Sequence, residues 1–202
     1  LKPRDNPHIN HWWMCDEGRY GWKHVHHAER QVQAYRQDTV TPTPLDSSLL
    51  ADELHQQLSS AGSLAAVLSP HLTVEEAYLL AHYIRSLDAE AQLVLGSIPE
   101  EGDDETYPGG FTIRAEKCPN RRGVEEVIAG IAGKVVGWEA FLESLSKEPP
   151  AGIWITGGYK SDWHDEETAN RFQDIPLTIV QDIFPSPLSQ LATYSLPAIT
   201  FA

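Results

Sequence analysis

The sequence predicts an α/β fold: a mostly parallel sheet flanked by helices, with a small irregular segment at the N-terminus. Three observations lead to this prediction. Short apolar runs alternate with helical patterns along residues 46–200, which is typical of βαβ units. The run at residues 64–68 is apolar throughout, as in a strand buried on both faces. Residues 1–36, rich in Trp, His and Arg, show neither pattern.

The first βαβ unit has the clearest signals. Residues 64–68 are a continuous apolar run and are expected to be a strand, and residues 92–96 are expected to be the next one. Between them, Thr73 and Glu76 have the spacing of a capping box, and apolar residues then recur at helical spacing over residues 77–87. We therefore expect a strand, a helix and a second, parallel strand.

The same criteria place the remaining elements. Residues 99–110 are acidic and rich in Gly and Pro, so we expect a loop there. Residues 123–147 carry two helical patterns that separate near residues 133–137. Further helices are expected at residues 46–61 and 165–172, and further strands at residues 152–156, 177–180 and 195–200.

The domain organisation follows from a change in composition. Residues 1–36 form the irregular segment, residues 37–45 are expected to be a linker, and residues 46–202 form the α/β domain. Pro42 and Pro44 favour extended backbone in the linker.

Charge and composition exclude several classes of protein. The net charge is −14, with +2 in residues 1–36 and −16 in residues 37–202, so general nucleic-acid binding is not expected. The chain lacks a run of about 18 apolar residues, the length of a membrane span. Two widely separated cysteines are no disulfide framework, which favours a reducing, cytoplasmic setting.

The segment that indicates chemistry is residues 10–22. Cys15, followed by two acidic residues and Gly18, predicts a tight turn that carries a thiol, and Arg19 would favour its thiolate form. A single cysteine is by itself more often an inert buried residue.

The spacing of this segment resembles a signature of the large redox subunit, named G, of the NADH-quinone oxidoreductase complex (complex I) and of its molybdopterin-oxidoreductase relatives. The matching residues are Asn10, Trp13, Cys15, Asp16, Gly18, Arg19 and Tyr20. The resemblance implies that Cys15 is the fourth ligand of a 4Fe-4S cluster in the full-length protein, with the other three ligands in an upstream Cys-x2-Cys-x3-Cys run. Glu17 stands where the molybdenum enzymes have a lysine, which favours the complex I protein, which lacks a molybdenum centre.

Further segments resemble the same family. Residues 69–87 are similar to the first βα unit of its pterin domain, and residues 119–125 to an Asn-Arg-Arg-Gly-Val segment. Residues 181–198 are similar to another family pattern, except that residues 193–195 read Thr-Tyr-Ser instead of Asp-Val-Val. The resemblance implies that residues 46–202 are a molybdopterin-oxidoreductase-like domain that continues beyond residue 202.

The family implies a function for the whole protein. The chain would be a fragment of an electron-transfer and scaffold subunit, bound to other subunits of a membrane-associated NADH dehydrogenase complex at the cytoplasmic side of the inner membrane. By itself it would be inactive and hold no cofactor. The alternatives are a fragment of an active molybdopterin-dependent enzyme, such as a formate dehydrogenase, and a non-catalytic binding module that retains the fold.

A ligand of this domain would bind where parallel strands end. The candidate residues are Ser69, Gly157, Gly158 and Asp182, as the remnant of a pterin site. The glycine pair after a strand could approach a phosphate, but a tight turn is the favoured interpretation.

Two further clusters have simpler explanations. The histidines at positions 24, 26 and 27 suggest zinc ligands, but polar imidazoles on a helix face are favoured. The acidic residues at positions 162–167 suggest acid–base chemistry, but a helix N-terminus explains them more simply.

Overall fold

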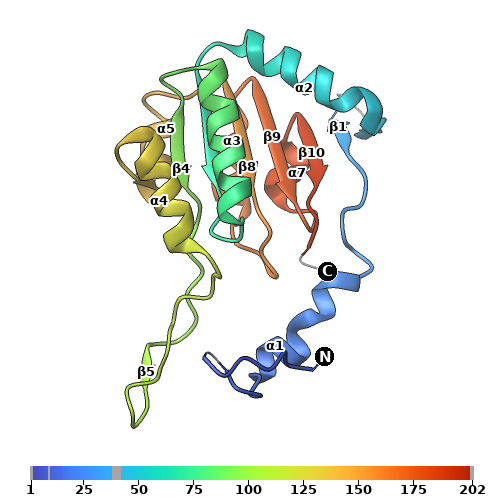
Figure 1. The fold of residues 1–202 in the computed structure, drawn as a ribbon. Helices are drawn as coiled ribbons and strands as arrows, with labels where there is room; N and C mark the ends of the chain where they lie inside the picture. Colours follow the sequence, from blue (N-terminus) through green and yellow to red (C-terminus); the bar gives the residue numbers. More distant parts are fainter. Residues whose placement is uncertain (1, 9, 38–41, 201–202) are drawn as a thin grey trace.

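The computed structural model describes residues 2–8, 10–37 and 42–200, and within them one large sheet runs through the molecule (Figure 1). Its eight strands pair in parallel except at the edge formed by the first two, so the predicted mostly parallel α/β fold is confirmed. Across the sheet the order is β2 (Pro42–Pro44), β1 (Tyr35–Gln37), β10 (Tyr194–Pro197), β9 (Leu177–Asp182), β8 (Gly152–Thr156), β3 (Leu64–Leu68), β4 (Gln92–Leu95) and β7 (Val136–Gly137).

The order of the parallel strands defines where the sheet changes direction. Counted along the chain from β3, the six parallel strands lie in the order 3-2-1-4-5-6, that of a doubly wound sheet. The chain therefore leaves β3 in opposite directions, and the switch point lies between β3 and β8. In sheets of this kind ligands bind outside the carboxyl ends of the strands at that point.

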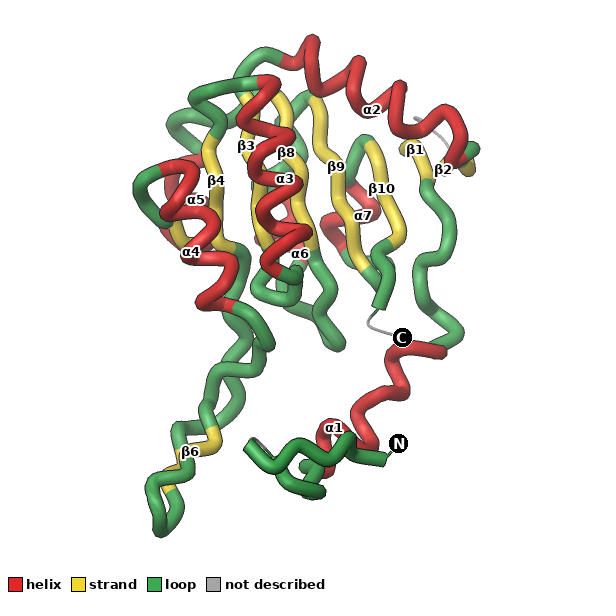
Figure 2. The backbone as a smooth tube through the Cα atoms, viewed as in Figure 1, coloured by secondary structure: helices red, strands yellow, loops and turns green. Residues whose placement is uncertain are grey.

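Helices cover both faces of the sheet (Figure 2). One face packs against α2 (Ser47–Ala61), α3 (Val74–Leu87) and α4 (Arg121–Ala132), and the other against α5 (Trp138–Leu145), α6 (Glu166–Asn170) and α7 (Pro187–Leu191). Residues alternate between the two cores along β3: Ala66 and Leu68 belong to the first, Ala65 and Val67 to the second. This double burial explains why β3 reads as a continuous apolar run.

The predicted helix starts are confirmed. Asp46 caps α2 by accepting a hydrogen bond from Ser48 N. Thr73 and Glu76 form the capping box of α3. None of the helices in the described part of the chain is long and apolar enough to cross a bilayer.

The expected loop at residues 99–110 is partly wrong. Residues 105–113 form a hairpin, in which β5 (Glu105–Thr106) pairs with β6 (Thr112–Ile113). Gly109 and Gly110 take positive φ values of 96° and 83°, and this allows the chain to reverse between strands only two residues long. Such short strands show no detectable period in the sequence.

The N-terminal segment is more ordered than expected. It contains α1 (Asp16–Tyr20) and a 3-10 helix, η1 (Gly21–His26), and ends in β1, which joins the sheet. The expected linker is also partly wrong, because Pro42–Pro44 pairs with β1 as the outermost strand. Proline is tolerated there because an edge strand leaves one side unpaired. Residues 38–41 of that linker lie outside the described residues.

Candidate functional site

The four candidate residues all lie at the carboxyl ends of the central strands. Ser69 follows β3, and its buried N–H donates to Thr156 Oγ1 at the end of β8, 2.9 Å away. The same hydroxyl donates to Val67 O at 2.9 Å. Ser69 is fully buried, so it joins the two strands at the switch point rather than facing a ligand.

Asp182 ends β9 and is the buried charged group of the site. Its side chain is 3% exposed. Oδ1 accepts hydrogen bonds from Gly158 N at 2.8 Å and from Ile183 N at 2.7 Å, and Oδ2 accepts one from Trp163 Nε1 at 3.0 Å. Burial raises the pKa of Asp182, and the three N–H donors oppose that rise because they stabilise the carboxylate.

The Gly157–Gly158 turn encloses this carboxylate. A Cβ at position 157 would lie 2.2 Å from Asp182 Cγ, and Gly158 has a φ of +99°. Gly157 N donates to Gln181 O at 2.8 Å, and Gly158 N donates to Asp182 Oδ1. With both N–H groups engaged beside a carboxyl group, a phosphate does not fit here, whereas the tight turn does.

Aromatic rings line the crevice beside the carboxylate. Tyr159 stacks on Trp163 with ring centroids 4.7 Å apart and planes at 19°, and it also contacts the His71 ring at 4.6 Å. Tyr159 OH donates to Ser97 O at 2.6 Å. Burial and the nearby Lys160 lower the pKa of His71 to about 4, and burial raises the pKa of Tyr159.

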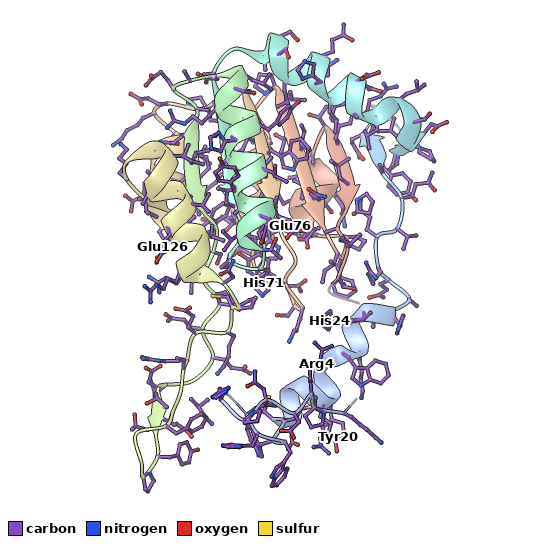
Figure 3. All side chains as sticks on the ribbon, viewed as in Figure 1. Arg4, Tyr20, His24, His71, Glu76 and Glu126 are labelled. Atoms are coloured by element: carbon purple, nitrogen blue, oxygen red, sulfur yellow. The ribbon has the colours of Figure 1, made fainter. Side chains whose placement is uncertain are left out.

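Two cavities open at this edge of the sheet. The first, of about 640 Å³, is lined by Asp182, the Tyr159–Trp163 stack and His24 of η1. The second, of about 1260 Å³, extends from His71 and the glycine turn towards residues 113–119. His24 borders both cavities, and Figure 3 shows it on the N-terminal segment facing the carboxyl edge on which His71 lies.

Cys15 lies at the start of α1 and is exposed. Its Sγ accepts a hydrogen bond from Gly18 N at 3.3 Å, as a helix N-cap does, so the start of α1 stands where a tight turn was expected. The side chain of Glu17 lies outside the described residues.

The segment after Cys15 is tied to the carboxyl ends of the last two strands. Gln31 N donates to Ile183 O at 2.9 Å, and Arg30 Nη2 donates to Ala198 O at 3.0 Å. The rings of His27 and Phe184 meet edge to face at 5.5 Å. These contacts hold the chain after η1 at the carboxyl edge of the sheet, and Figure 1 shows α1 beyond that edge.

The described residues hold no group of three or more His, Cys, Asp or Glu side chains placed to bind a metal ion. Cys118 is half-buried beside Glu116, and burial raises its pKa to about 12, so its thiol is protonated at neutral pH. The histidines at positions 24 and 26 lie on η1, and Asp165 caps α6 by accepting from Thr168 N.

The sequence pattern did not mark Thr156, Tyr159, Trp163 and His71 as residues of the site. Thr156 is a hydroxyl at the end of an otherwise apolar strand, and that contrast could have marked it. Trp163 stands among the acidic residues explained as a helix N-terminus, which hid its contact with Asp182.

A scan against protein-family models finds no match for this chain, and neither does a search of the curated proteins.

Proposed function

We propose that this chain is part of an electron-transfer and scaffold subunit of an NADH:quinone oxidoreductase, related to the molybdopterin oxidoreductases. The observation that supports the proposal is the exposed thiol of Cys15. Its sulfur accepts a hydrogen bond from Gly18 N, and both residues belong to the pattern that extends from Asn10 to Tyr20. Exposure leaves the sulfur open to a metal, and hydrogen bonds to ligating sulfurs tune iron–sulfur clusters.

A 4Fe-4S cluster needs four protein ligands, and this chain can supply one of them. The chain has two cysteines, and Cys118 is a poor ligand because burial and Glu116 favour its protonated form. Cys15 supplies one thiolate, and the resemblance assigns the other three to an upstream segment. When bound, such a cluster supplies one-electron transfer, while residues 46–202 form the scaffold against which it lies.

The position of Cys15 agrees with this role. Arg30 and Gln31 hold the chain after η1 at the carboxyl ends of β9 and β10, so a cluster at Cys15 would lie beyond that edge of the sheet and not on a face covered by helices (Figure 1). Partners in this proposal are the other subunits of the membrane-associated complex, on its cytoplasmic side.

The experiment uses the full-length subunit in its complex. Cys15→Ala removes one protein ligand, so one 4Fe-4S signal disappears from the low-temperature electron paramagnetic resonance spectrum. Cys118→Ala is the matched control and leaves every cluster signal intact. An unchanged spectrum in Cys15→Ala would refute the ligand assignment. The 202-residue chain alone is expected to bind no stoichiometric iron.

A second candidate rests on Asp182. A buried carboxylate that lines a cavity with the Tyr159–Trp163 stack suits a flat heterocycle that has N–H donors, such as a pterin. This would make the chain a pterin-binding part of a molybdopterin oxidoreductase. A ligand there would pack against the aromatic rings and donate hydrogen bonds to the carboxylate.

Titration of a pterin followed by tryptophan fluorescence tests the second candidate. Binding quenches Trp163, and Asp182→Asn weakens it about tenfold or more because the amide replaces an acceptor with a donor. Asp165→Asn, at the exposed start of α6, is the control and leaves the affinity unchanged. Absence of quenching at millimolar pterin rejects this candidate, and the domain then fits a non-catalytic module.

A further inference from the structure

An arm, residues 97–118, leaves the body of the molecule between β4 and α4. It extends beyond the carboxyl edge of the sheet and carries the β5–β6 hairpin at its far end (Figures 1 and 2). The two sides of the hairpin are exposed, and the arm contributes little to either hydrophobic core. Core packing therefore does not explain its length.

Hydrogen bonds hold the arm in one shape. Glu101 N donates to Ala115 O and Lys117 N donates to Pro99 O, each at 2.8 Å. Closer to the tip, Asp104 accepts from Arg114 Nη1 at 2.9 Å.

The base of the arm is fastened to α4. Arg121 bonds Glu116 on the arm and Glu125 on the helix, each at 2.9 Å. The hairpin is thus preorganised, which lowers the entropy lost when such an element binds a partner.

The tip presents aromatic side chains to solvent. Tyr107 and Phe111 flank the turn, with Tyr107 N donating to Phe111 O at 2.8 Å and ring centroids 6.2 Å apart. Tyr107 is 45% exposed, Phe111 60% and the neighbouring Ile113 44%. Aromatic residues dominate the energetic centres of protein interfaces, and their grouping at a projecting tip is typical of an anchor.

The charge of the arm restricts what can bind it. Residues 99–118 contain six acidic and two basic residues, a net charge of −4. The whole chain carries −14, so a second copy would be repelled, as would an anionic membrane or a nucleic acid. A cationic surface is complementary. The exposed acidic residues of the arm are Glu100, Glu101, Asp103, Asp104 and Glu105.

We propose that the arm is a docking element for another polypeptide, in which an apolar socket for Tyr107 and Phe111 is rimmed by arginine or lysine. The aromatic tip supplies the buried contact, and the acidic sides steer and orient the approach. This inference does not depend on the redox assignment, because it uses no residue of the Cys15 segment and neither Asp182 nor the Tyr159–Trp163 stack.

The test places a photoreactive phenylalanine at position 111 of the full-length protein in its own cells. A matched probe replaces Tyr78, which is 49% exposed on α3. Position 111 is expected to cross-link to a peptide of a different polypeptide with net positive charge around the linked residue, at a yield well above that at position 78. Cross-links to the protein itself, to a second copy, to lipid or to an uncharged or acidic peptide overturn the proposal, as does a yield equal to that at position 78.

Two variants check which features carry the contact. Tyr107→Ser and the triple reversal Glu100→Lys, Glu101→Lys, Asp103→Lys are each expected to lower the yield at position 111 about tenfold. The control reverses Glu139, Glu143 and Glu148, exposed residues on and just after α5, and so makes the same change in net charge elsewhere. Thermal unfolding checks that each variant is folded. Equal losses in the control and in the arm reversal would show that overall charge, not the arm, is responsible.

Discussion

Replacing Gly157 with alanine tests how the glycine turn and Asp182 depend on each other. The new Cβ would lie 2.2 Å from Asp182 Cγ and Oδ2 and 2.4 Å from Oδ1, all closer than atoms can approach. Gly157 is not among the glycines with positive φ, so backbone strain adds nothing and the clash alone determines the result.

The Asp182 carboxylate cannot move away from a new Cβ without losing hydrogen bonds. Moving it away breaks bonds from Gly158 N, Ile183 N and Trp163 Nε1, which lie 2.7–3.0 Å from its oxygens. Each hydrogen bond to a charged group contributes roughly 1.5–3 kcal/mol net. Loss of two of the three, with relaxation of the loop, predicts that Gly157→Ala lowers the free energy of unfolding by about 3–5 kcal/mol.

Urea denaturation measures this value. Gly130→Ala is the control: its Cβ meets no atom within 4 Å, and within α4 it should stabilise by about 0.5–1 kcal/mol. In an Asp182→Ala background the clashing atoms are gone, so Gly157→Ala should then cost less than about 1 kcal/mol. An equal loss of stability from Gly157→Ala in that background and in the wild type would show that the clash with Asp182 is not its cause.

Three further changes give expected outcomes. Gly123→Ala puts a Cβ 2.3 Å from Asn120 Oδ1, which displaces that amide from Leu72 O and costs about 1–2 kcal/mol by urea denaturation, whereas an unchanged midpoint would contradict the contact. The pKa of His71 is lowered from 6.5 to about 4, so the unfolded state binds a proton that the native state does not; stability is lost as pH falls from 6.5 towards 4, and His71→Gln should flatten that slope, with His82→Gln as control. Burial raises the pKa of Asp182, so its contribution is largest when protonated and declines as pH rises from 3.8 through the raised pKa; the stability of wild type relative to Asp182→Asn should fall over that window, and a rise would refute the direction.

The sequence predicted the centre of the fold better than its edges. Residues 64–68 and 152–156 match β3 and β8 because both faces of these strands are buried, which makes the run of apolar residues continuous. Tyr35–Gln37 was missed because one partner strand, β10, lies at the other end of the sequence. Its other partner, Pro42–Pro44, is close in sequence, but its two prolines are typical of a linker and not of a strand.

The candidate site was predicted in position but not in its contacts. Parallel strands end at one edge, so Ser69, the glycine pair and Asp182 had to lie near one another. The bond from Ser69 N to Thr156 joins residues 87 apart in sequence, and that from Trp163 to Asp182 depends on how the loop after β8 folds back. Neither separation has a periodic signature.

The contacts also separate the roles of the four predicted residues. Ser69 is buried and hydrogen-bonded to its neighbours. The two glycines leave space for Asp182, and their N–H groups are engaged in hydrogen bonds within the protein. Of the four, Asp182 is the residue whose side chain borders a cavity. A buried carboxyl group with a raised pKa destabilises the ionised protein, and an apolar residue in its place would avoid that cost. Instead, three N–H donors hold the carboxylate beside the aromatic rings. The residue at position 157 is a glycine, and any Cβ there would clash with the carboxylate. That cost is understandable if Asp182 receives hydrogen bonds from a ligand, and the pterin titration with Asp182→Asn measures that contact directly.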